Sequence, residues 1–292
     1  MAFVIYQNEK FLDEDRAHVS VADRGFLVGE GLFETMRAYN NHVVFVKEHL
    51  LCLTEGAEQL EIELPVSLER LRFLVYQTLH LNKLHDAVVR VYLTTEGSGI
   101  GDLDSPPKKI NLLISCKPHV SFSANCYEKG VDVCWVKNVV AEQGLLSQIK
   151  STSYLSRLLA RREAQKKNCF EGIMLNPHGH VAEGSGSNLF IVFDSKIYTP
   201  PIEEGLLMGV TRQQVIHLAE KEGIEISEKV ILPEDVLQAD EVFITSTLKE
   251  IMPVKKVEDY KIKFAPGPIT RKLLEIYRDT VQWHVETAEE PS

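Results

Sequence analysis

The stretch "QIKSTSYLSRLLARREAQKK" (148–167) places Lys150 between an apolar residue and a Ser-Thr-Ser step, directly before an amphipathic helical pattern. Most lysines are solvated surface charges, and a cation at the start of a helix opposes the helix dipole. A lysine attacks a carbonyl only as the neutral amine, which an apolar neighbour such as Ile149 favours. Position alone leaves two interpretations open, a surface charge or a reactive amine.

The composition is typical of a globular intracellular enzyme. The 292 residues, 44% of them hydrophobic, suffice for one large or two medium domains. The net charge of −10 argues against nucleic-acid binding, which needs clustered positive charge. The five cysteines show no metal-ligand spacing, so we expect neither a metal nor a disulfide framework, and a cytoplasmic location. The apolar run 2–5 is too short for a signal segment, and no run approaches a membrane span.

Strand and helix patterns alternate along the whole chain, which predicts a mixed α/β or α+β enzyme of two domains. A Gly/Pro-rich loop at 97–108 separates two β-branched runs, and the polar segment 118–130 reads as a linker. We expect strands at 3–6, 87–96, 109–117, 131–136 and 239–254, a hairpin over 29–46 turning at Asn40-Asn41, a β-meander over 172–200, and helices at 47–62, 68–82, 152–167, 210–223 and 268–284.

Three further stretches carry groups that could bind a ligand, and each has a purely structural alternative. Glu183 precedes Gly-Ser-Gly-Ser, which could present backbone N–H groups or be a simple bulge. Val210 and Thr211 open a helix, where N–H groups bind phosphate, although Thr211 could merely cap it. Ser246 and Thr247 follow a strand and could bind an anion or cap a turn.

Together with Lys150, these residues form the set that pyridoxal 5'-phosphate (PLP) requires. A lysine holds the aldehyde as a Schiff base, a carboxylate keeps the pyridine nitrogen protonated, and backbone and hydroxyl donors hold the phosphate.

The chain resembles the class IV aminotransferases, the fold-type IV PLP enzymes, which include branched-chain and D-amino-acid aminotransferases and aminodeoxychorismate lyase. The resemblance lies in five blocks in family order: "VSVADRGFLVGEGLFETMR" (19–37), "IKSTSYLSRLLARREA" (149–164), "VAEGSGSNLFIV" (181–192), "GLLMGVTR" (205–212) and "VFITSTLKEIMPV" (242–254).

The resemblance implies an α+β fold of two domains. We assign residues 1–120 to a smaller N-terminal α/β domain, 121–130 to the linker, and 131–292 to a larger, β-rich, PLP-binding C-terminal domain. Family members hold the cofactor between the two domains and are usually homodimers.

The resemblance also assigns roles. Lys150 would form the Schiff base and shuttle the proton, and Glu183 would contact the pyridine nitrogen. Val210 and Thr211, completed by Thr247 and Ser246, would hold the phosphate. The cofactor's phenolic oxygen would accept a hydrogen bond from Tyr154. Candidate substrate contacts are Phe33, Arg90 and Tyr92, and no metal is implied.

The sequence departs from the family in two places. Cys52 stands where an arginine usually pairs with the phosphate, and Thr95-Glu96-Gly97 replaces Thr-Arg-Gly. The loop 97–108 lacks the Arg-x-His carboxylate trap of D-amino-acid enzymes. The run after Lys150 favours an aminotransferase acting on an amino acid and a 2-oxo acid. The alternatives are a lyase that releases pyruvate, a divergent, weakly active member, and a non-catalytic binding protein.

Overall fold

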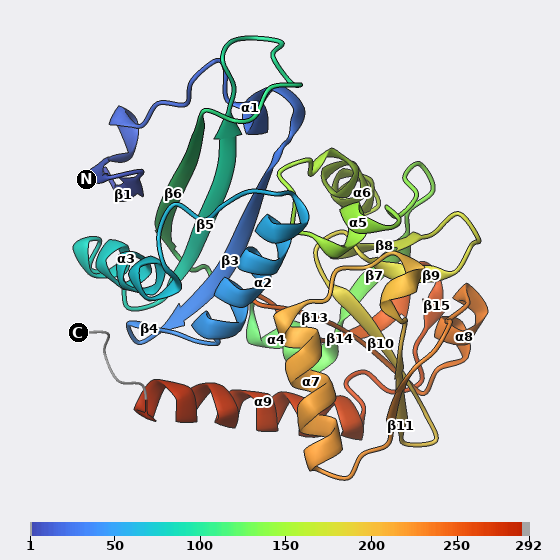
Figure 1. The fold of residues 1–292 in the computed structure, drawn as a ribbon. Helices are drawn as coiled ribbons and strands as arrows, with labels where there is room; N and C mark the ends of the chain where they lie inside the picture. Colours follow the sequence, from blue (N-terminus) through green and yellow to red (C-terminus); the bar gives the residue numbers. More distant parts are fainter. Residues whose placement is uncertain (1, 288–292) are drawn as a thin grey trace. The chain divides into compact units, whose positions relative to one another are not determined.

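The computed structural model describes residues 2–287, which group into two compact units with a sheet and helices each (Figure 1). The first unit comprises the described residues of Met1–Val120, Ile149–Tyr154 and Val281–Ser292. The second comprises Ser121–Gln148 and Leu155–Thr280. The expected α+β architecture of two domains is confirmed.

Two segments do not belong to the parts of the chain to which the predicted domain limits assigned them. The stretch 121–130, expected as a linker, contains helix α4 (Ala124–Lys129) and belongs to the second unit. The stretch 149–154, which includes Lys150, groups with the first unit although it was expected in the C-terminal domain.

The first unit contains a six-stranded antiparallel sheet in the order β2-β1-β6-β5-β3-β4. The hairpin predicted at Asn40-Asn41 is confirmed, because both residues adopt positive φ (46° and 70°) between β3 and β4. Its strands are β1 (Val4–Gln7), β2 (Lys10–Asp13), β3 (Gly31–Tyr39), β4 (His42–Val43), β5 (Ala87–Glu96) and β6 (Lys109–Pro118).

Two amphipathic helices, α2 (Val46–Gln59) and α3 (Leu68–Leu81), share one apolar core with this sheet. Helix α3 begins after Ser67, whose hydroxyl accepts the Arg70 N–H at 3.2 Å. The other helical segments of this unit are η1 (Glu14–Arg16), α1 (Arg24–Val28) and the last turns of α9 (Pro268–Thr287).

The second unit contains a nine-stranded mixed sheet in the order β12-β11-β10-β13-β14-β7-β8-β9, with β15 paired to β14. At its centre the buried rings of Phe190 and Phe243 stack with centroids 4.9 Å apart on paired strands. The strands are β7 (Val131–Trp135), β8 (Glu171–Leu175), β9 (Val181–Gly184), β10 (Asn188–Phe193), β11 (Lys196–Thr199), β12 (Ile226–Glu228), β13 (Glu241–Ser246), β14 (Glu250–Val257) and β15 (Tyr260–Lys261).

The meander predicted over 172–200 is wrong. Strands β8 and β9 pair, as do β10 and β11, but β13, β14 and β7 lie between the two hairpins in the order of the sheet. Between β9 and the start of β10 the chain forms an isolated bridge, from Gly184 to Ser187. A continuous meander and two separated hairpins have the same local sequence pattern. Pairing with strands that are distant along the chain decides between them, so the local pattern could not.

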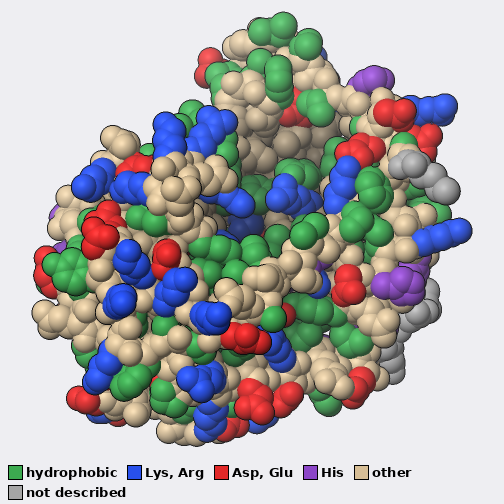
Figure 2. All heavy atoms as spheres, turned by 180° about the vertical axis from the view of Figure 1, so that it is seen from behind, with side chains coloured by type: hydrophobic (Ala, Val, Ile, Leu, Met, Phe, Trp, Pro, Cys, Tyr) green, Lys and Arg blue, Asp and Glu red, His purple; other side chains and the backbone are tan. Residues whose placement is uncertain are grey.

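Helices of the second unit connect its strands. They are α4, α5 (Leu145–Gln148), α6 (Leu155–Lys166), η2 (Ile202–Glu204), α7 (Val210–Lys221), α8 (Pro233–Gln238) and the first part of α9. In the described range, no helix combines the length and apolarity that crossing a membrane requires. Basic and acidic side chains both lie among apolar ones on the face drawn in Figure 2.

Glu163 on α6 fastens the loop after β7, and we expect this contact to make stability depend on pH. Its carboxylate accepts the Lys137 and Asn138 N–H groups at 3.0 and 3.2 Å. Desolvation raises the pKa of Glu163, but these hydrogen bonds outweigh it and lower the pKa to about 2. The contribution is therefore present above the usual value near 4.5 and is lost as the pH falls toward 2.

Glu163→Gln should therefore lower the Tm at pH 7 by about 2–4 °C, which is roughly 1 kcal/mol. The Tm difference from the wild type should shrink between pH 4.5 and pH 3. A difference that is constant with pH would show that the charge of Glu163 is not what fastens the loop.

Candidate active site

Lys150 lies in an extended segment that hydrogen-bonds to β3 rather than in a helix. Its carbonyl accepts the Phe33 N–H at 2.9 Å, and the Thr152 N–H donates to the Gly31 carbonyl at 2.8 Å. The Thr152 hydroxyl also donates to Gly29. These contacts occupy the backbone of 150–152, so the helix expected over 152–167 begins only at Leu155.

The Lys150 amine lies beside a cluster of aromatic side chains in the first unit, which it reaches through Phe33. Its Nζ lies 5.3 Å from the ring centroid of Phe33. The Phe33 ring stacks on Tyr92 at 5.9 Å and meets Tyr154 edge-on at 5.4 Å. Arg90 donates to the Tyr92 hydroxyl at 3.2 Å. The four residues predicted as substrate or cofactor contacts in this unit thus form one chain of side-chain contacts, which meets Lys150 at Phe33.

The register of β5 settles which face carries these groups. Tyr92 pairs with Phe33, and Arg90 pairs with Thr35 two residues further along β3. Because side chains alternate along a strand, Phe33, Arg90 and Tyr92 share one face of the sheet.

Cys52 lies on α2 and carries a neutral thiol. Burial raises its pKa to about 12, the carboxylates of Glu34, Glu55 and Glu48 add to the rise, and Lys150 opposes it. Glu34 is itself buried and pairs with His49 at 2.9 Å. The position where the family usually has an arginine therefore lies in acidic surroundings and offers no cation.

Glu183 ends up as a buried carboxylate on β9, and two groups hold it. Its Oε1 lies 2.5 Å from a guanidinium nitrogen of Arg157, and its Oε2 accepts the Leu207 N–H at 3.2 Å. Arg157 is on the first turn of α6, with only 11% of its side chain exposed. Arg157 was not among the residues predicted from the sequence, where its one signal is an arginine on the buried side of an amphipathic helix.

The turn that opens α7 fits a phosphate. Val210 and Thr211 are its first two residues, and no side chain among the described residues caps it. Asn188 holds the preceding loop by donating to the Leu207 carbonyl at 2.8 Å. A Cβ at Gly209 would overlap the amide oxygen of Asn188, so a larger residue there would require the Asn188 side chain or the turn to move.

We expect Gly209→Ala to weaken PLP binding about tenfold, since the added methyl group must displace either Asn188 or the α7 turn. Fluorescence titration of cofactor-free protein with PLP measures this. Gly99→Ala is the control, because a Cβ at Gly99 meets open space. Equal PLP affinity in Gly209→Ala and the wild type would exclude the turn from the cofactor site.

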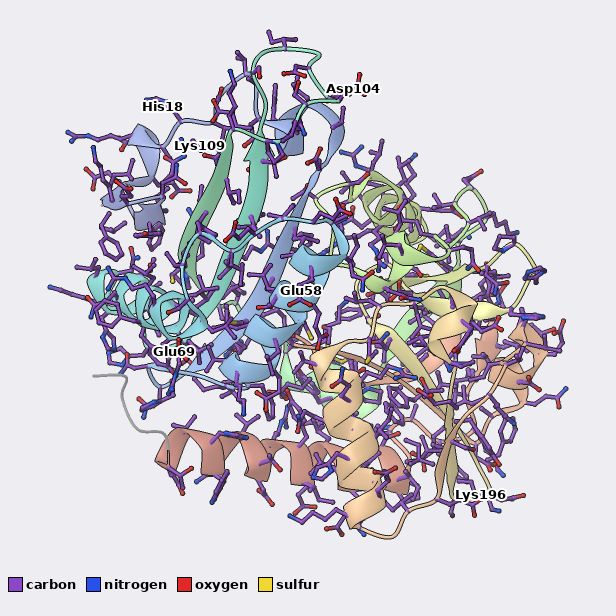
Figure 3. All side chains as sticks on the ribbon, in the orientation of Figure 1. His18, Glu58, Glu69, Asp104, Lys109 and Lys196 are labelled. Atoms are coloured by element: carbon purple, nitrogen blue, oxygen red, sulfur yellow. The ribbon has the colours of Figure 1, made fainter. Side chains whose placement is uncertain are left out.

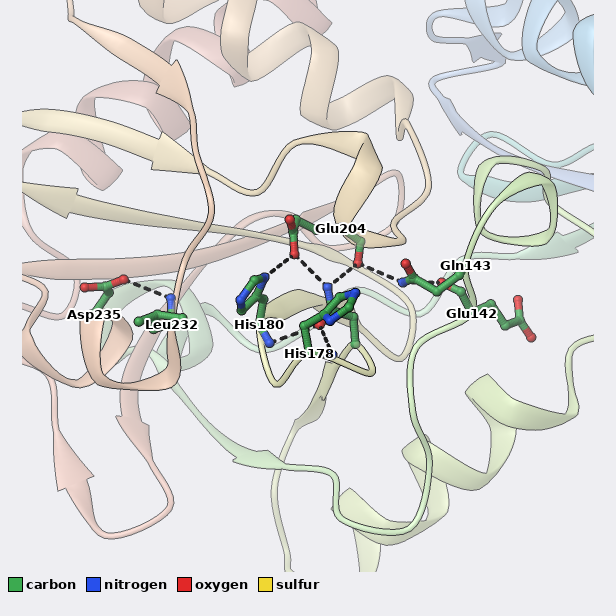
Figure 4. Close-up of polar contacts among 8 residues, drawn as sticks. Glu142, Gln143, His178, His180, Glu204, Leu232 and Asp235 are labelled. Atoms are coloured by element: carbon green, nitrogen blue, oxygen red, sulfur yellow. Dashed lines mark hydrogen bonds and ion pairs between the residues drawn. The ribbon is translucent and has the colours of Figure 1, made fainter.

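Glu204 anchors the other end of the loop that leads to α7 (Figure 4). Its carboxylate lies 2.8 Å from Nδ1 of His180 and accepts from the Asn176 amide at 2.6 Å. The Gln143 amide donates to its carbonyl at 3.2 Å. The loop 204–209 is thereby fixed at both ends, which positions the Leu207 N–H against Glu183.

Ser246 ends β13, and Thr247 opens the turn to β14. The Ser246 hydroxyl accepts the Lys249 N–H at 3.3 Å, so Ser246 does cap its turn. Asn188 pairs with Thr245 across β10 and β13, and its side chain also holds the loop before α7. Both predicted phosphate turns are thus tied to Asn188.

The Gly/Pro-rich loop 97–108 is held by one buried side chain. Arg24 donates to the carbonyls of Asp102 at 3.0 Å and Ser105 at 2.5 Å. Figure 3 shows Asp104 in this loop and Lys109 at the start of β6. The loop contains neither arginine nor histidine.

The described residues fit PLP. The second unit supplies a buried carboxylate for a protonated ring nitrogen and an uncapped helix start for a phosphate. The first unit supplies a lysine among aromatic side chains. No group of acidic, histidine and cysteine side chains within 2–287 has the geometry of a metal site.

The family model of class IV amino-transferases matches residues 31–257. The chain is 37% identical to a putative branched-chain-amino-acid aminotransferase of Methanocaldococcus jannaschii, over 98% of this chain and 99% of that protein. It is 29% identical to a D-alanine aminotransferase of Bacillus licheniformis, over 91% and 93%.

Solved structures agree with these matches. The branched-chain amino acid aminotransferase of Escherichia coli superposes with a TM-score of 0.89 at 30% identity, covering 96% of this chain and 94% of that one. A branched-chain amino acid aminotransferase complex with pyridoxamine 5'-phosphate gives a TM-score of 0.90 at 26% identity, over 96% and 94%.

Proposed function

Because this chain belongs to the class IV aminotransferase family, we propose that Lys150 is the catalytic residue of a PLP-dependent transamination between an amino acid and a 2-oxo acid. The family, its cofactor and the reaction class follow from the matches, and no match favours the lyase. The residue assignments that follow are our proposal.

When bound, PLP accepts electrons from the substrate's α-carbon and carries the amino group. The Lys150 amine would hold the aldehyde carbon and move a proton at the substrate's α-carbon. The Glu183 carboxylate would keep a proton on the ring nitrogen. The phosphate would be held by the N–H groups of Val210 and Thr211 and by the turn at Ser246 and Thr247.

The observation that carries this assignment is the anchored carboxylate of Glu183. Burial of a carboxylate costs free energy unless partners stabilise the charge. Arg157 and the Leu207 N–H stabilise the negative charge here, and each of them binds one oxygen of the carboxylate. The site thus keeps an anion in a buried position, which is what a protonated pyridine nitrogen needs as a partner.

We further propose that the amino donor is a branched-chain or other apolar L-amino acid. The aromatic side chains of Phe33, Tyr92 and Tyr154 offer an apolar surface beside Lys150. Several relatives are named branched-chain aminotransferases, and the loop 97–108 contains neither the arginine nor the histidine that would trap a D-amino acid's carboxylate.

A panel of amino donors tests this choice. L-Leu, L-Ile and L-Val should convert the bound cofactor to its pyridoxamine form, which the absorption spectrum reports, faster than D-Ala does. Faster conversion by D-Ala would assign the protein to the D-amino-acid branch. Release of pyruvate without an amino acceptor would identify a lyase.

Arg90 is our candidate for the substrate's carboxylate. It is exposed and is oriented by its hydrogen bond to Tyr92. We expect Arg90→Met to raise the KM for the amino donor about 10–100-fold, the effect of one charge-assisted contact. The Tm should not change, and Arg90→Lys should recover part of the KM. An unchanged KM would remove Arg90 from the substrate site.

We also propose a cytoplasmic homodimer. The family resemblance supports the dimer, and the free cysteines among the described residues support a reducing compartment. Light scattering of the purified protein at micromolar concentration should give twice the chain mass of 33.0 kDa. A monomeric mass would contradict the proposal.

A further inference from the structure

A buried ion pair joins two cofactor-binding segments of the second unit. Lys249 Nζ lies 2.5 Å from Oε2 of Glu171. Only 13% of the Lys249 side chain and 2% of the Glu171 side chain are exposed. Lys249 Nζ also donates to the Gly186 carbonyl at 3.0 Å.

Both oxygens of Glu171 have further donors. Oε1 accepts the Gly172 N–H at 3.1 Å and the Ser185 hydroxyl, and Oε2 accepts the Ser187 hydroxyl at 3.1 Å. Burial alone would raise the pKa of Glu171, but Lys249 and these donors lower it. The Glu171 carboxylate is therefore ionised at neutral pH.

Lys249 and Glu171 join two segments, the turn after β13 and the link from β9 to β10. Ser185 and Ser187 lie in this link, which follows the strand that carries Glu183, the proposed partner of the ring nitrogen. Lys249 closes the turn that carries Thr247, a proposed phosphate ligand. In the strand order, β7 and β8 separate β14 from β9. Asn188, at the end of the link from β9, pairs with Thr245 beside the turn, and the contacts of Lys249 with Glu171 and Gly186 add a side-chain connection from this turn to β8 and to the link.

Stability alone does not explain a pair of this kind. Desolvation of two charges costs about as much as their attraction returns, and apolar pairs of similar volume are often as stable. A buried, fully hydrogen-bonded pair fixes the positions of the groups it contacts, because the hydrogen bonds of Glu171 are directional.

We propose that Lys249 and Glu171 are positioning residues that lock the Thr247 turn to the Glu183 segment, so that the phosphate and ring-nitrogen contacts keep a fixed spacing. The inference rests on the proposed roles of Glu183 and Thr247. Neither Lys249 nor Glu171 touches the cofactor in this arrangement.

The test compares PLP with pyridoxal, which lacks the phosphate. We define selectivity as the Kd of pyridoxal divided by the Kd of PLP, measured by titrating cofactor-free protein. Lys249→Met should lower the selectivity about tenfold, the effect of one charge-assisted hydrogen bond. Lys255→Met, an exposed lysine on the neighbouring strand β14, is the matched control and should keep the selectivity.

The double variant Glu171→Gln/Lys249→Met leaves no buried charge without its partner and keeps the test usable if the single variant folds poorly. Its Tm should recover toward the wild type while its selectivity stays low. Amide hydrogen exchange in 246–250 should be faster than in the wild type. Wild-type selectivity in the double variant would overturn the proposal, because the pair would then serve stability alone.

Thr247→Val separates this inference from the proposed site. If Thr247→Val lowers the selectivity and the double variant does not, the locking role is wrong and the phosphate site stands. If neither variant changes the selectivity, the turn does not bind phosphate and the locking role is overturned with it.

Discussion

Replacing Lys150 with alanine is expected to lower kcat by at least about 10³-fold, because the change removes both the covalent attachment point and the proton carrier. The Tm should change little, since the backbone contacts of Lys150 with β3 do not involve its side chain. Steady-state transamination of L-Leu and 2-oxoglutarate measures kcat. Borohydride reduction followed by mass spectrometry measures covalent attachment of PLP.

Two control variants sharpen this test. Lys150→Arg keeps the positive charge beside Phe33 but offers no amine that can attach to an aldehyde, so it should be as inactive as Lys150→Ala. Lys166→Ala removes an exposed lysine from α6 and should keep both activity and labelling. A cofactor mass that persists on Lys150→Ala would place the attachment point on another lysine.

The fold was largely predictable because its signals are local. Runs of β-branched residues marked β5 and β6, and the positive-φ tolerance of Asn40 and Asn41 marked the hairpin of β3 and β4. The start of α6 was misplaced because Thr152 bonds to Gly29 and Gly31, more than a hundred residues away. The meander over 172–200 failed for the same reason, since strand pairing is decided by distant partners.

The candidate site also contains residues marked by local sequence and residues that depend on distant partners. Lys150, Glu183 and Thr211 lie in ordered motifs and were assigned by resemblance. Arg157 and Lys249 were not found, because a charged side chain gives no sign of burial until its partner is known. Their partners, Glu183 and Glu171, are distant along the chain. Such pairs follow from the packing of whole elements rather than from any window of sequence.

Glu183→Gln is expected to lower kcat about 10²–10³-fold, because an amide cannot stabilise a protonated ring nitrogen as a carboxylate does in a buried site. The variant should also lose about 3–5 kcal/mol of unfolding free energy, since the buried guanidinium of Arg157 loses its carboxylate. Urea unfolding of cofactor-free protein measures the second effect.

Adding Arg157→Met to Glu183→Gln separates catalysis from stability. The double variant removes the buried charge that the single variant leaves behind, so its unfolding free energy should rise again by several kcal/mol. Its kcat should stay low, because the ring nitrogen still has no anionic partner. If both stability and kcat recover, Glu183 acts only as a structural partner of Arg157. If neither stability nor kcat recovers, the ion pair does not account for the lost stability. Only recovery of stability without recovery of kcat supports Glu183 as the group that holds the proton on the cofactor.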